Sequence, residues 1–149
     1  MKGLIILFMD NYRQPADFYF LRMALLVSER GTCVRRKVGC IIVKDRQIIS
    51  DGYNGTPSGM DNECEYEFEG KLITKPLVLH AESNALMKLA KSNNSSNGAT
   101  IYLSLSPCFD CAKLIVQAGI KRVVYREIYR DRSGLLLLEE NKIDHEQCE

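Results

Sequence analysis

Residues 100–125, TIYLSLSPCFDCAKLIVQAGIKRVVY, decide the fold class of this 149-residue chain. The apolar runs at the two ends of this stretch, 100–104 and 121–125, indicate short buried strands. Pro107 suits the first turn of a helix, which is predicted over residues 108–118. A strand, a helix and a second strand in this order predict a right-handed parallel crossover.

The segments on either side supply an antiparallel pair and three more helices. The apolar run at 38–43 is typical of a strand buried on both faces, and residues 47–50 are predicted to return beside it as a hairpin. Helices are predicted over 15–29, 80–91 and 135–141. The expected inward positions are Phe18, Leu21, Leu25 and Leu26 in the first helix, and Ala85, Leu86, Leu89 and Ala90 in the second.

Helices that alternate with buried strands predict an α/β fold, a three-layer α/β/α sandwich with a mixed central sheet of about five strands. The length and the lack of an internal repeat predict one domain over residues 1–149, with residues 1–14 as an N-terminal extension. Residues 51–76 are predicted to be a long loop insertion, and a connection of this length in a compact domain is usually functional.

The composition is that of a soluble globular domain, with 46% hydrophobic and 26% charged residues. A formal net charge of +1 argues against nucleic acid as a partner. No apolar stretch reaches the roughly 18 residues of a membrane span. The first nine residues resemble a very short signal peptide, but no small-residue cleavage site follows them. We therefore expect a cytoplasmic protein with reduced thiols. For the N-terminal residues, an extra strand, a packed arm and an extension upstream of a start at Met9 all stay open.

Two motifs carry the chemistry: His80-Ala81-Glu82 and Pro107-Cys108-Phe109-Asp110-Cys111. One imidazole and two thiolates can hold Zn²⁺ and leave the fourth tetrahedral position for water. Cys108 and Cys111 are three residues apart and share one helix face. Both lie at a helix N-terminus, where the helix dipole favours thiolate over thiol. Glu82 is placed to move protons without being a ligand.

A His-x-Glu motif followed by Pro-Cys-x-x-Cys is typical of zinc-dependent nucleobase deaminases. In such a reaction zinc lowers the pKa of its bound water from about 15.7 towards about 7. Glu82 would carry a proton from that water to the ring N3 and later to the leaving amine, which contributes on the order of 10²–10⁴-fold. The competing interpretation is a structural zinc knuckle. Structural sites use four protein ligands, however, and the chain has only two histidines, His80 and His145.

Over about residues 18–130 the sequence resembles the deoxycytidylate (dCMP) deaminase family. The most specific stretches are Val38-Gly39-Cys40-Ile41-Ile42-Val43, Gly52-Tyr53-Asn54-Gly55-Thr56-Pro57-Ser58-Gly59, His80-Ala81-Glu82-Ser83-Asn84-Ala85 and Leu105-Ser106-Pro107-Cys108-Phe109-Asp110-Cys111-Ala112. Small cytidine deaminases usually carry Cys where His80 stands. The tRNA adenosine deaminases share the zinc motif but lack the Gly-Tyr-Asn-Gly-Thr-Pro-x-Gly stretch.

The resemblance implies a set of substrate contacts. Asn54 would contact the base or the sugar, and the backbone of Ala81 and Ser106 would line the base pocket. Tyr129 falls where the family often places an aromatic ring near the pyrimidine, although simple packing is an alternative. The groups expected to receive the 5′-phosphate are Arg35, Arg36, Thr56 and Ser58, for which a solvated turn around the arginines is the alternative.

The resemblance also bears on the remaining cysteines. Many family members carry a second, structural zinc, and Cys33 and Cys64 match two of its ligand positions. Residues 65–79 contain no His or Cys, so the second site is either lost or completed by another residue. Cys40 is expected in the core. The tail with His145 and Cys148 is expected to be poorly ordered.

As a whole, the resemblance implies conversion of dCMP to dUMP for thymidylate synthesis, with Zn²⁺ as cofactor and a homo-oligomer, favoured as a hexamer. Larger members are activated by dCTP and inhibited by dTTP, which suggests similar effectors here. Two alternatives stay open: a deaminase of another cytosine nucleotide or of a polynucleotide, and a non-catalytic, zinc-stabilised binding module. The near-neutral charge argues against the polynucleotide, and the free carboxylate of Glu82 argues against the module.

Overall fold

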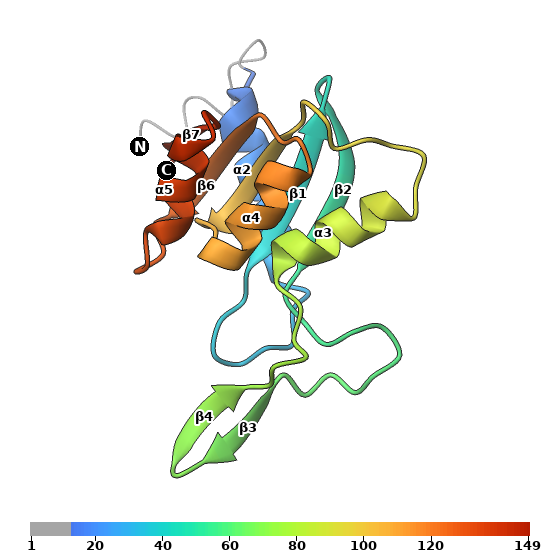
Figure 1. Ribbon diagram of the computed structural model, residues 1–149. Helices are drawn as coiled ribbons and strands as arrows, with labels where there is room; N and C mark the ends of the chain where they lie inside the picture. Colours follow the sequence, from blue (N-terminus) through green and yellow to red (C-terminus); the bar gives the residue numbers. More distant parts are fainter. Residues whose placement is uncertain (1–12) are drawn as a thin grey trace, which may run out of the picture.

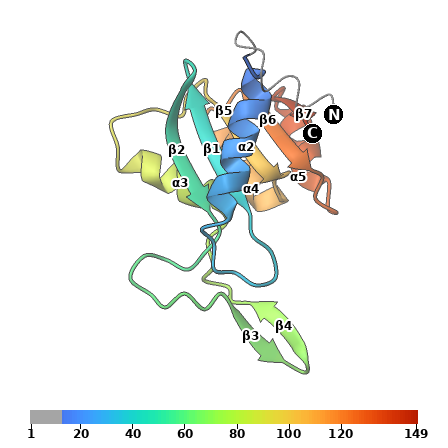
Figure 2. The ribbon, with the colours of Figure 1, turned by 180° about the vertical axis from the view of Figure 1, so that it is seen from behind.

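The computed structural model describes residues 13–149, in which four helices cover the two faces of a five-stranded sheet (Figures 1 and 2). The elements are α2 (Ala16–Ser28), β1 (Gly39–Lys44), β2 (Gln47–Tyr53), β3 (Glu65–Phe68), β4 (Lys71–Thr74), α3 (Ala81–Ala90), β5 (Thr100–Leu105), α4 (Phe109–Gln117), β6 (Arg122–Glu127), α5 (Ser133–Glu140) and β7 (Asp144–Gln147). Apart from its last two residues, the predicted extension 1–14 lies outside the described residues. Within the described part, no helix is both long and apolar enough to cross a membrane.

The central sheet is mixed, as predicted, with the strand order β2-β1-β5-β6-β7. β1 pairs antiparallel with β2 and with β5, whereas β5, β6 and β7 run parallel. The predicted hairpin of β1 and β2 closes through Asp45 and Arg46, whose φ angles are 50° and 64°. Two consecutive left-handed residues make the kind of two-residue turn that matches the natural twist of a hairpin.

The three predicted layers follow from the alternation of side chains along β1. Cys40 and Ile42 belong to the core under α3, α4 and α5, and Ile41 and Val43 belong to the core under α2. Figure 2 shows α2 alone against its face of the sheet. Cys40 is fully buried, which confirms its predicted place in the core.

The inward face of α2 differs from the prediction. Leu21 is buried as expected, but its buried partners are Phe20 and Ala24, and Leu26 is 57% exposed. The cause is a close contact with β1: a Cβ on Gly39 would lie 1.9 Å from the Ala24 carbonyl oxygen. This contact sets the rotation of the helix and turns Leu26 away from the sheet. In α3, Ala90 is likewise exposed, whereas the other three predicted positions are buried.

Part of the predicted loop 51–76 forms regular secondary structure. β2 continues to Tyr53, and residues 65–74 form a second antiparallel hairpin, β3–β4. Glu69 and Gly70 form its turn with φ angles of 50° and 73°. Figure 1 shows this hairpin extending below the sandwich, away from the central sheet.

The C-terminal tail is ordered, contrary to the prediction. β7 adds a parallel edge strand beside β6, and the Cys148 backbone N–H donates to the Tyr125 carbonyl oxygen at 2.9 Å. The His145 ring lies 3.2 Å from the Tyr125 hydroxyl and 2.9 Å from a Glu139 carboxylate oxygen. The four residues of β7, Asp-His-Glu-Gln, carry no apolar alternation, so nothing in the pattern indicated a strand.

A polar cluster joins α2 to the sheet. The Arg122 guanidinium donates to both carboxylate oxygens of Asp17, at 2.8 and 2.7 Å, and the Tyr102 hydroxyl donates to Asp17 at 2.8 Å. Arg122 also pairs with Glu146 of β7. The hydrogen bonds from Arg122, more than the one from Tyr102, lower the pKa of Asp17 from 3.8 to about 2.

We expect Asp17→Asn to lower the free energy of unfolding at neutral pH by about 1–2 kcal/mol. A folded-state pKa below the unfolded value means that this contribution is complete above pH 4 and is lost as the pH falls towards 2. Chemical denaturation of both proteins between pH 2 and 7 checks the prediction. Asp51→Asn, which breaks the more exposed pair with Lys88, serves as the control. A constant difference across the pH range would contradict the assignment.

Candidate active site

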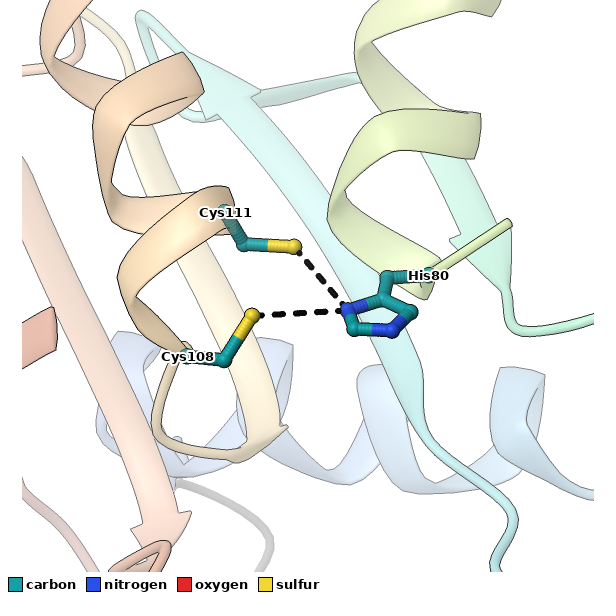
Figure 3. A group of neighbouring side chains, drawn as sticks. All are labelled: His80, Cys108 and Cys111. Carbon is teal, nitrogen blue, oxygen red and sulfur yellow. Dashed lines mark hydrogen bonds between the residues drawn. The ribbon is translucent and has the colours of Figure 1, made fainter. Parts of the chain in front are cut away.

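The two sequence motifs meet where two helices begin side by side. His80 has extended backbone angles and immediately precedes α3, and Cys108 does the same before α4. Cys111 lies in the first turn of α4. Figure 3 shows the His80 ring directed at both sulfur atoms. The β-α-β unit predicted from residues 100–125 therefore delivers the two thiols to the imidazole.

The three side chains form a compact donor cluster. The His80 Nδ1 atom lies 3.5 Å from the Cys108 sulfur and 3.3 Å from the Cys111 sulfur. All three donor atoms lie within 4.8 Å of one another. Donors about 2.0–2.3 Å from a tetrahedral ion are separated by distances of this order, and one nitrogen with two sulfurs suits Zn²⁺. These residues thus fit a zinc ion. Within residues 13–149, no other group of three or more His, Cys, Asp or Glu side chains brings its donor atoms together in this way.

Hydrogen bonds favour the ionised form of one thiol. The hydrogen bond from Cys111, followed by that from His80, lowers the pKa of Cys108 from 9.0 to about 4, whereas the same hydrogen bond and burial raise the pKa of Cys111. A thiolate is the form that binds a metal ion.

Glu82 lies in the first turn of α3, beside the donor cluster but not part of it. Its side chain is only 4% exposed and lines the same cavity as His80 and Cys108. Burial raises the pKa of Glu82 above its usual range. A carboxyl group in this position has the reach and the environment of a proton carrier.

The cluster opens into a cavity of about 410 Å³. Six of the residues predicted to contact substrate line it: Arg35, Arg36, Asn54, Ala81, Ser106 and Tyr129. Thr56 and Ser58 do not line it. The Thr56 hydroxyl donates instead to the Asp61 carbonyl oxygen at 2.6 Å, and Ser58 is exposed to solvent. Their predicted contact with a phosphate has no support in this arrangement.

Asn54 braces the segment that carries the arginines. Its carboxamide oxygen accepts a hydrogen bond from the Val38 N–H at 2.8 Å, and its amide nitrogen donates to the Arg36 carbonyl oxygen at 2.9 Å. The Asn54 N–H also donates to the Val38 carbonyl oxygen. The predicted substrate contact would therefore use the remaining hydrogen-bonding capacity of this side chain.

Ser106 joins the opposite wall of the cavity to the metal motif. It is 3% exposed and stands two residues before Cys108. Its N–H donates to the Glu127 carbonyl oxygen at 2.8 Å, and its hydroxyl accepts from the Tyr129 N–H at 2.7 Å. The segment after β6 is thus attached at two points to the residue that leads into the thiols.

Several residues that line the cavity were not predicted from the sequence. Glu65 and Thr74 come from the unrecognised hairpin, and Val78 and Arg130 come from the segments that flank the two motifs. Glu65 accepts hydrogen bonds from the N–H groups of Val34 and Arg35, at 2.9 and 3.1 Å. Two signals existed in the sequence. Arg130 follows the aromatic residue predicted near the pyrimidine, and the alternation of Glu65-Tyr66-Glu67-Phe68 ahead of Gly70 is typical of a hairpin.

Cys33 and Cys64 are brought together, but as a disulfide rather than as ligands, so the expectation of reduced thiols is wrong for this pair. No third His, Cys, Asp or Glu donor joins them within residues 13–149. The arrangement gives no support to a second zinc site and instead links the β3–β4 hairpin to the segment before β1.

Two glycines let the backbones that carry the motifs approach other elements. A Cβ on Gly52 would lie 2.5 Å from the Ala81 carbonyl oxygen, and a Cβ on Gly134 would lie 2.2 Å from the Pro107 carbonyl oxygen. Real Cβ atoms do not approach backbone this closely. β2 therefore supports the start of α3 directly, and α5 supports the start of α4.

We expect Gly134→Ala to displace the Pro107–Cys108 backbone, to cost about 1–3 kcal/mol in unfolding free energy and to weaken zinc binding. Gly55→Ala is a matched control, because its Cβ would meet nothing within 4 Å. Thermal unfolding and competition with a metal chelator measure both effects. Unchanged zinc affinity in Gly134→Ala would show that α5 does not determine the position of Cys108.

The comparisons with known proteins agree with this site. The family described as the cytidine and deoxycytidylate deaminase zinc-binding region matches residues 15–127. The chain belongs to this family and has its cytidine deaminase-like sandwich, and the family description as a zinc-binding region agrees with the zinc-fitting cluster.

Among the relatives, the chain is 38% identical over 128 residues to the deoxycytidylate deaminase of Schizosaccharomyces pombe, covering 80% of this chain but only 39% of that protein. It is also 38% identical to the deoxycytidylate deaminase of Enterobacteria phage T4, covering 73% of this chain and 76% of the phage protein. A crystal structure of the dCMP deaminase from cyanophage S-TIM5, in complex with dCMP and dUMP, matches with a TM-score of 0.85 and 42% identity, covering 92% of this chain and all of that one.

Proposed function

We propose that this protein is a zinc-dependent deaminase that hydrolyses dCMP to dUMP and ammonia and so supplies dUMP for thymidylate synthesis. The observation that carries the proposal is the convergence of His80, Cys108 and Cys111 beside the buried carboxyl group of Glu82, in one cavity. The cyanophage protein whose structure matches over all of its own length was solved with dCMP and dUMP bound.

In the proposed reaction, the zinc ion activates the water and Glu82 transfers the protons. A zinc ion held by His80, Cys108 and Cys111 would supply a water molecule activated for attack on C4 of the cytosine ring. Glu82 takes the proton from the attacking water and passes it to the ring N3, which makes C4 more electrophilic. After attack, Glu82 takes the proton of the hydroxyl group now on C4 and delivers it to the amino group, which leaves as ammonia while the C4 carbonyl forms. The burial of Glu82 suits this cycle, because a raised pKa lets the carboxyl group hold and release a proton.

The remaining cavity residues would orient the nucleotide. Ala81 and Ser106 would line the base, with Tyr129 near the ring and Asn54 near the base or the sugar. Arg35 and Arg36 are candidate phosphate contacts. A 410 Å³ cavity that ends on a buried carboxyl group fits a mononucleotide, and the net charge of +1 provides no extended basic track for a polynucleotide.

Three further points stay predictions: regulation by dCTP and dTTP, assembly into a hexamer, and a cytoplasmic location. Light scattering, together with dCMP titrations with and without each triphosphate, would check the first two. A sigmoidal response to dCMP that dCTP abolishes is the expected sign of regulation.

The function is tested by measuring ammonia release from dCMP, dCTP, deoxycytidine and single-stranded DNA with the zinc-loaded protein. We expect turnover of dCMP to exceed that of the other three substrates in kcat/KM. Preference for dCTP would favour another cytosine nucleotide, and preference for DNA would favour the polynucleotide alternative. Release from none of them would leave the non-catalytic module.

A further inference from the structure

The β3–β4 hairpin stands apart from the sandwich. Within residues 13–149, its two strands pair only with each other, and Tyr66 and Phe68 on β3 are exposed. Figure 1 shows the hairpin extending away from the central sheet. Two residues at its base, Glu65 and Thr74, nevertheless line the cavity. What the hairpin contributes to the cavity therefore depends on the contacts made at this base.

The base of the hairpin is joined to the segment between α2 and β1. The disulfide between Cys33 and Cys64 makes the first connection, immediately before β3. The Glu65 carboxylate makes the second: one of its oxygens accepts hydrogen bonds from the N–H groups of Val34 and Arg35, at 2.9 and 3.1 Å. Val34 and Arg35 lie outside any helix or strand, so these N–H groups need partners from elsewhere in the chain. Glu65 thus fixes the backbone from which the Arg35 side chain starts.

Thr74 holds the other end of the same side chain. It lies directly opposite Glu65 in the register of the hairpin, and its hydroxyl accepts a hydrogen bond from the Arg35 guanidinium at 3.1 Å. One pair of facing residues on β3 and β4 therefore holds both the backbone and the guanidinium of Arg35, which also lines the cavity. A guanidinium has five N–H donors, so the contact with Thr74 leaves others for a ligand.

Holding Arg35 at both ends has a consequence for binding. An arginine side chain has large rotamer freedom, and an exposed one that nothing holds loses this freedom when it binds a ligand. Arg35 is exposed to solvent, so only its contacts with the hairpin restrict it. A group that is fixed before the ligand arrives binds the ligand more tightly, because less conformational entropy is lost on binding.

We infer that Glu65 and Thr74 are positioning residues: through their contacts with Arg35, the base of the β3–β4 hairpin fixes the guanidinium in the cavity wall for the phosphate of the nucleotide. The inference rests on the proposed deaminase function and deepens it. Neither residue needs to touch the substrate, and the proposed proton transfers use Glu82. Loss of either residue should therefore weaken nucleotide binding without slowing the chemical step.

The first test is calorimetric titration of the zinc-loaded full chain with dUMP and with deoxyuridine, which needs no turnover. Thr74→Val keeps the shape of the side chain and removes the hydroxyl, so we expect dUMP to bind about three- to tenfold more weakly and deoxyuridine to bind unchanged. Thr74→Ser keeps the hydroxyl and should bind both ligands like the unmodified protein.

The same titrations are made with variants of Glu65. Glu65→Ala should weaken dUMP binding about tenfold, because two N–H groups lose their acceptor. Glu65→Gln keeps an acceptor oxygen and should recover most of the loss. The matched control is Glu67→Ala, on the same strand two residues later, where the side chain is exposed and does not line the cavity. It should change neither ligand.

A double-mutant cycle shows whether Thr74 acts through Arg35. Arg35→Gln alone should weaken dUMP binding selectively, and Thr74→Val added to it should cause no further loss. A full additional loss would mean that Thr74 contacts the ligand itself, which overturns the inference. Equal losses for dUMP and deoxyuridine, or no loss in Thr74→Val and Glu65→Ala, would overturn it too. These outcomes are read from binding alone, so they stand whether or not dCMP is deaminated.

Discussion

Glu82→Gln is expected to lower kcat for dCMP by at least about 10³-fold while the chain stays folded and keeps its zinc. The amide has the shape of the carboxyl group but cannot carry the proton between water, ring and amine, and general acid–base steps of this kind contribute on the order of 10²–10⁴-fold. Glu82 lies outside the donor cluster, so its charge is not needed to hold the ion. Steady-state ammonia release and zinc content, measured on the same preparation, check both parts.

The control for this variant is Glu140→Gln, at the exposed end of α5 away from the cavity. Its kinetics should match those of the unmodified protein. If Glu82→Gln retains more than a tenth of the activity, the proton carrier is a different group. If it loses zinc, Glu82 is a metal ligand and the division of roles is wrong.

His80→Ala is expected to abolish both zinc retention and activity. Removing the only imidazole of the cluster leaves two thiols from one helix, which cannot close around an ion without a donor from α3. Metal-ligand loss should appear in elemental analysis after dialysis as far less than one zinc per chain, whereas Glu82→Gln keeps its zinc. The two variants therefore fail in different ways.

The second histidine of the chain provides the matched control for that experiment. His145 lies between Tyr125 and Glu139, on the contact between β7 and the rest of the sandwich. His145→Ala should lower thermal stability and keep a full complement of zinc. Equal zinc loss in both histidine variants would show that zinc retention reports on folding and not on ligation by His80.

The chemistry of the site could be predicted because its residues are close in sequence to helix starts. Spacing alone places Cys108 and Cys111 on one face of a helix. His80, at the start of the neighbouring helix, supplies the third donor. The layer order followed from the alternation of helices with apolar strands. These features depend on local patterns, which can be recognised in a single sequence.

The rest depended on contacts that no local pattern encodes. The rotation of α2 follows from the approach of Ala24 to Gly39, which is a tertiary contact. The β3–β4 hairpin has two strands of only four residues each. β3 alternates polar and aromatic residues, but Tyr66 and Phe68 are exposed and belong to no core, and the hairpin brings Glu65 and Thr74 to the cavity. For Thr56 and Ser58, a Gly-rich stretch suggested phosphate contact, but neither residue lines the cavity, whereas Asn54 of the same stretch does. Site walls built from distant segments are the part that sequence patterns describe least well.

The most direct test of the account is X-ray absorption at the zinc edge of the purified protein, with and without dUMP. We predict one zinc per chain with two sulfur ligands at about 2.3 Å and lighter ligands at about 2.0–2.1 Å, one of which is exchangeable water. Four protein ligands with no exchangeable position, or three or more sulfur ligands, would contradict the claim that His80, Cys108 and Cys111 form an open hydrolytic site.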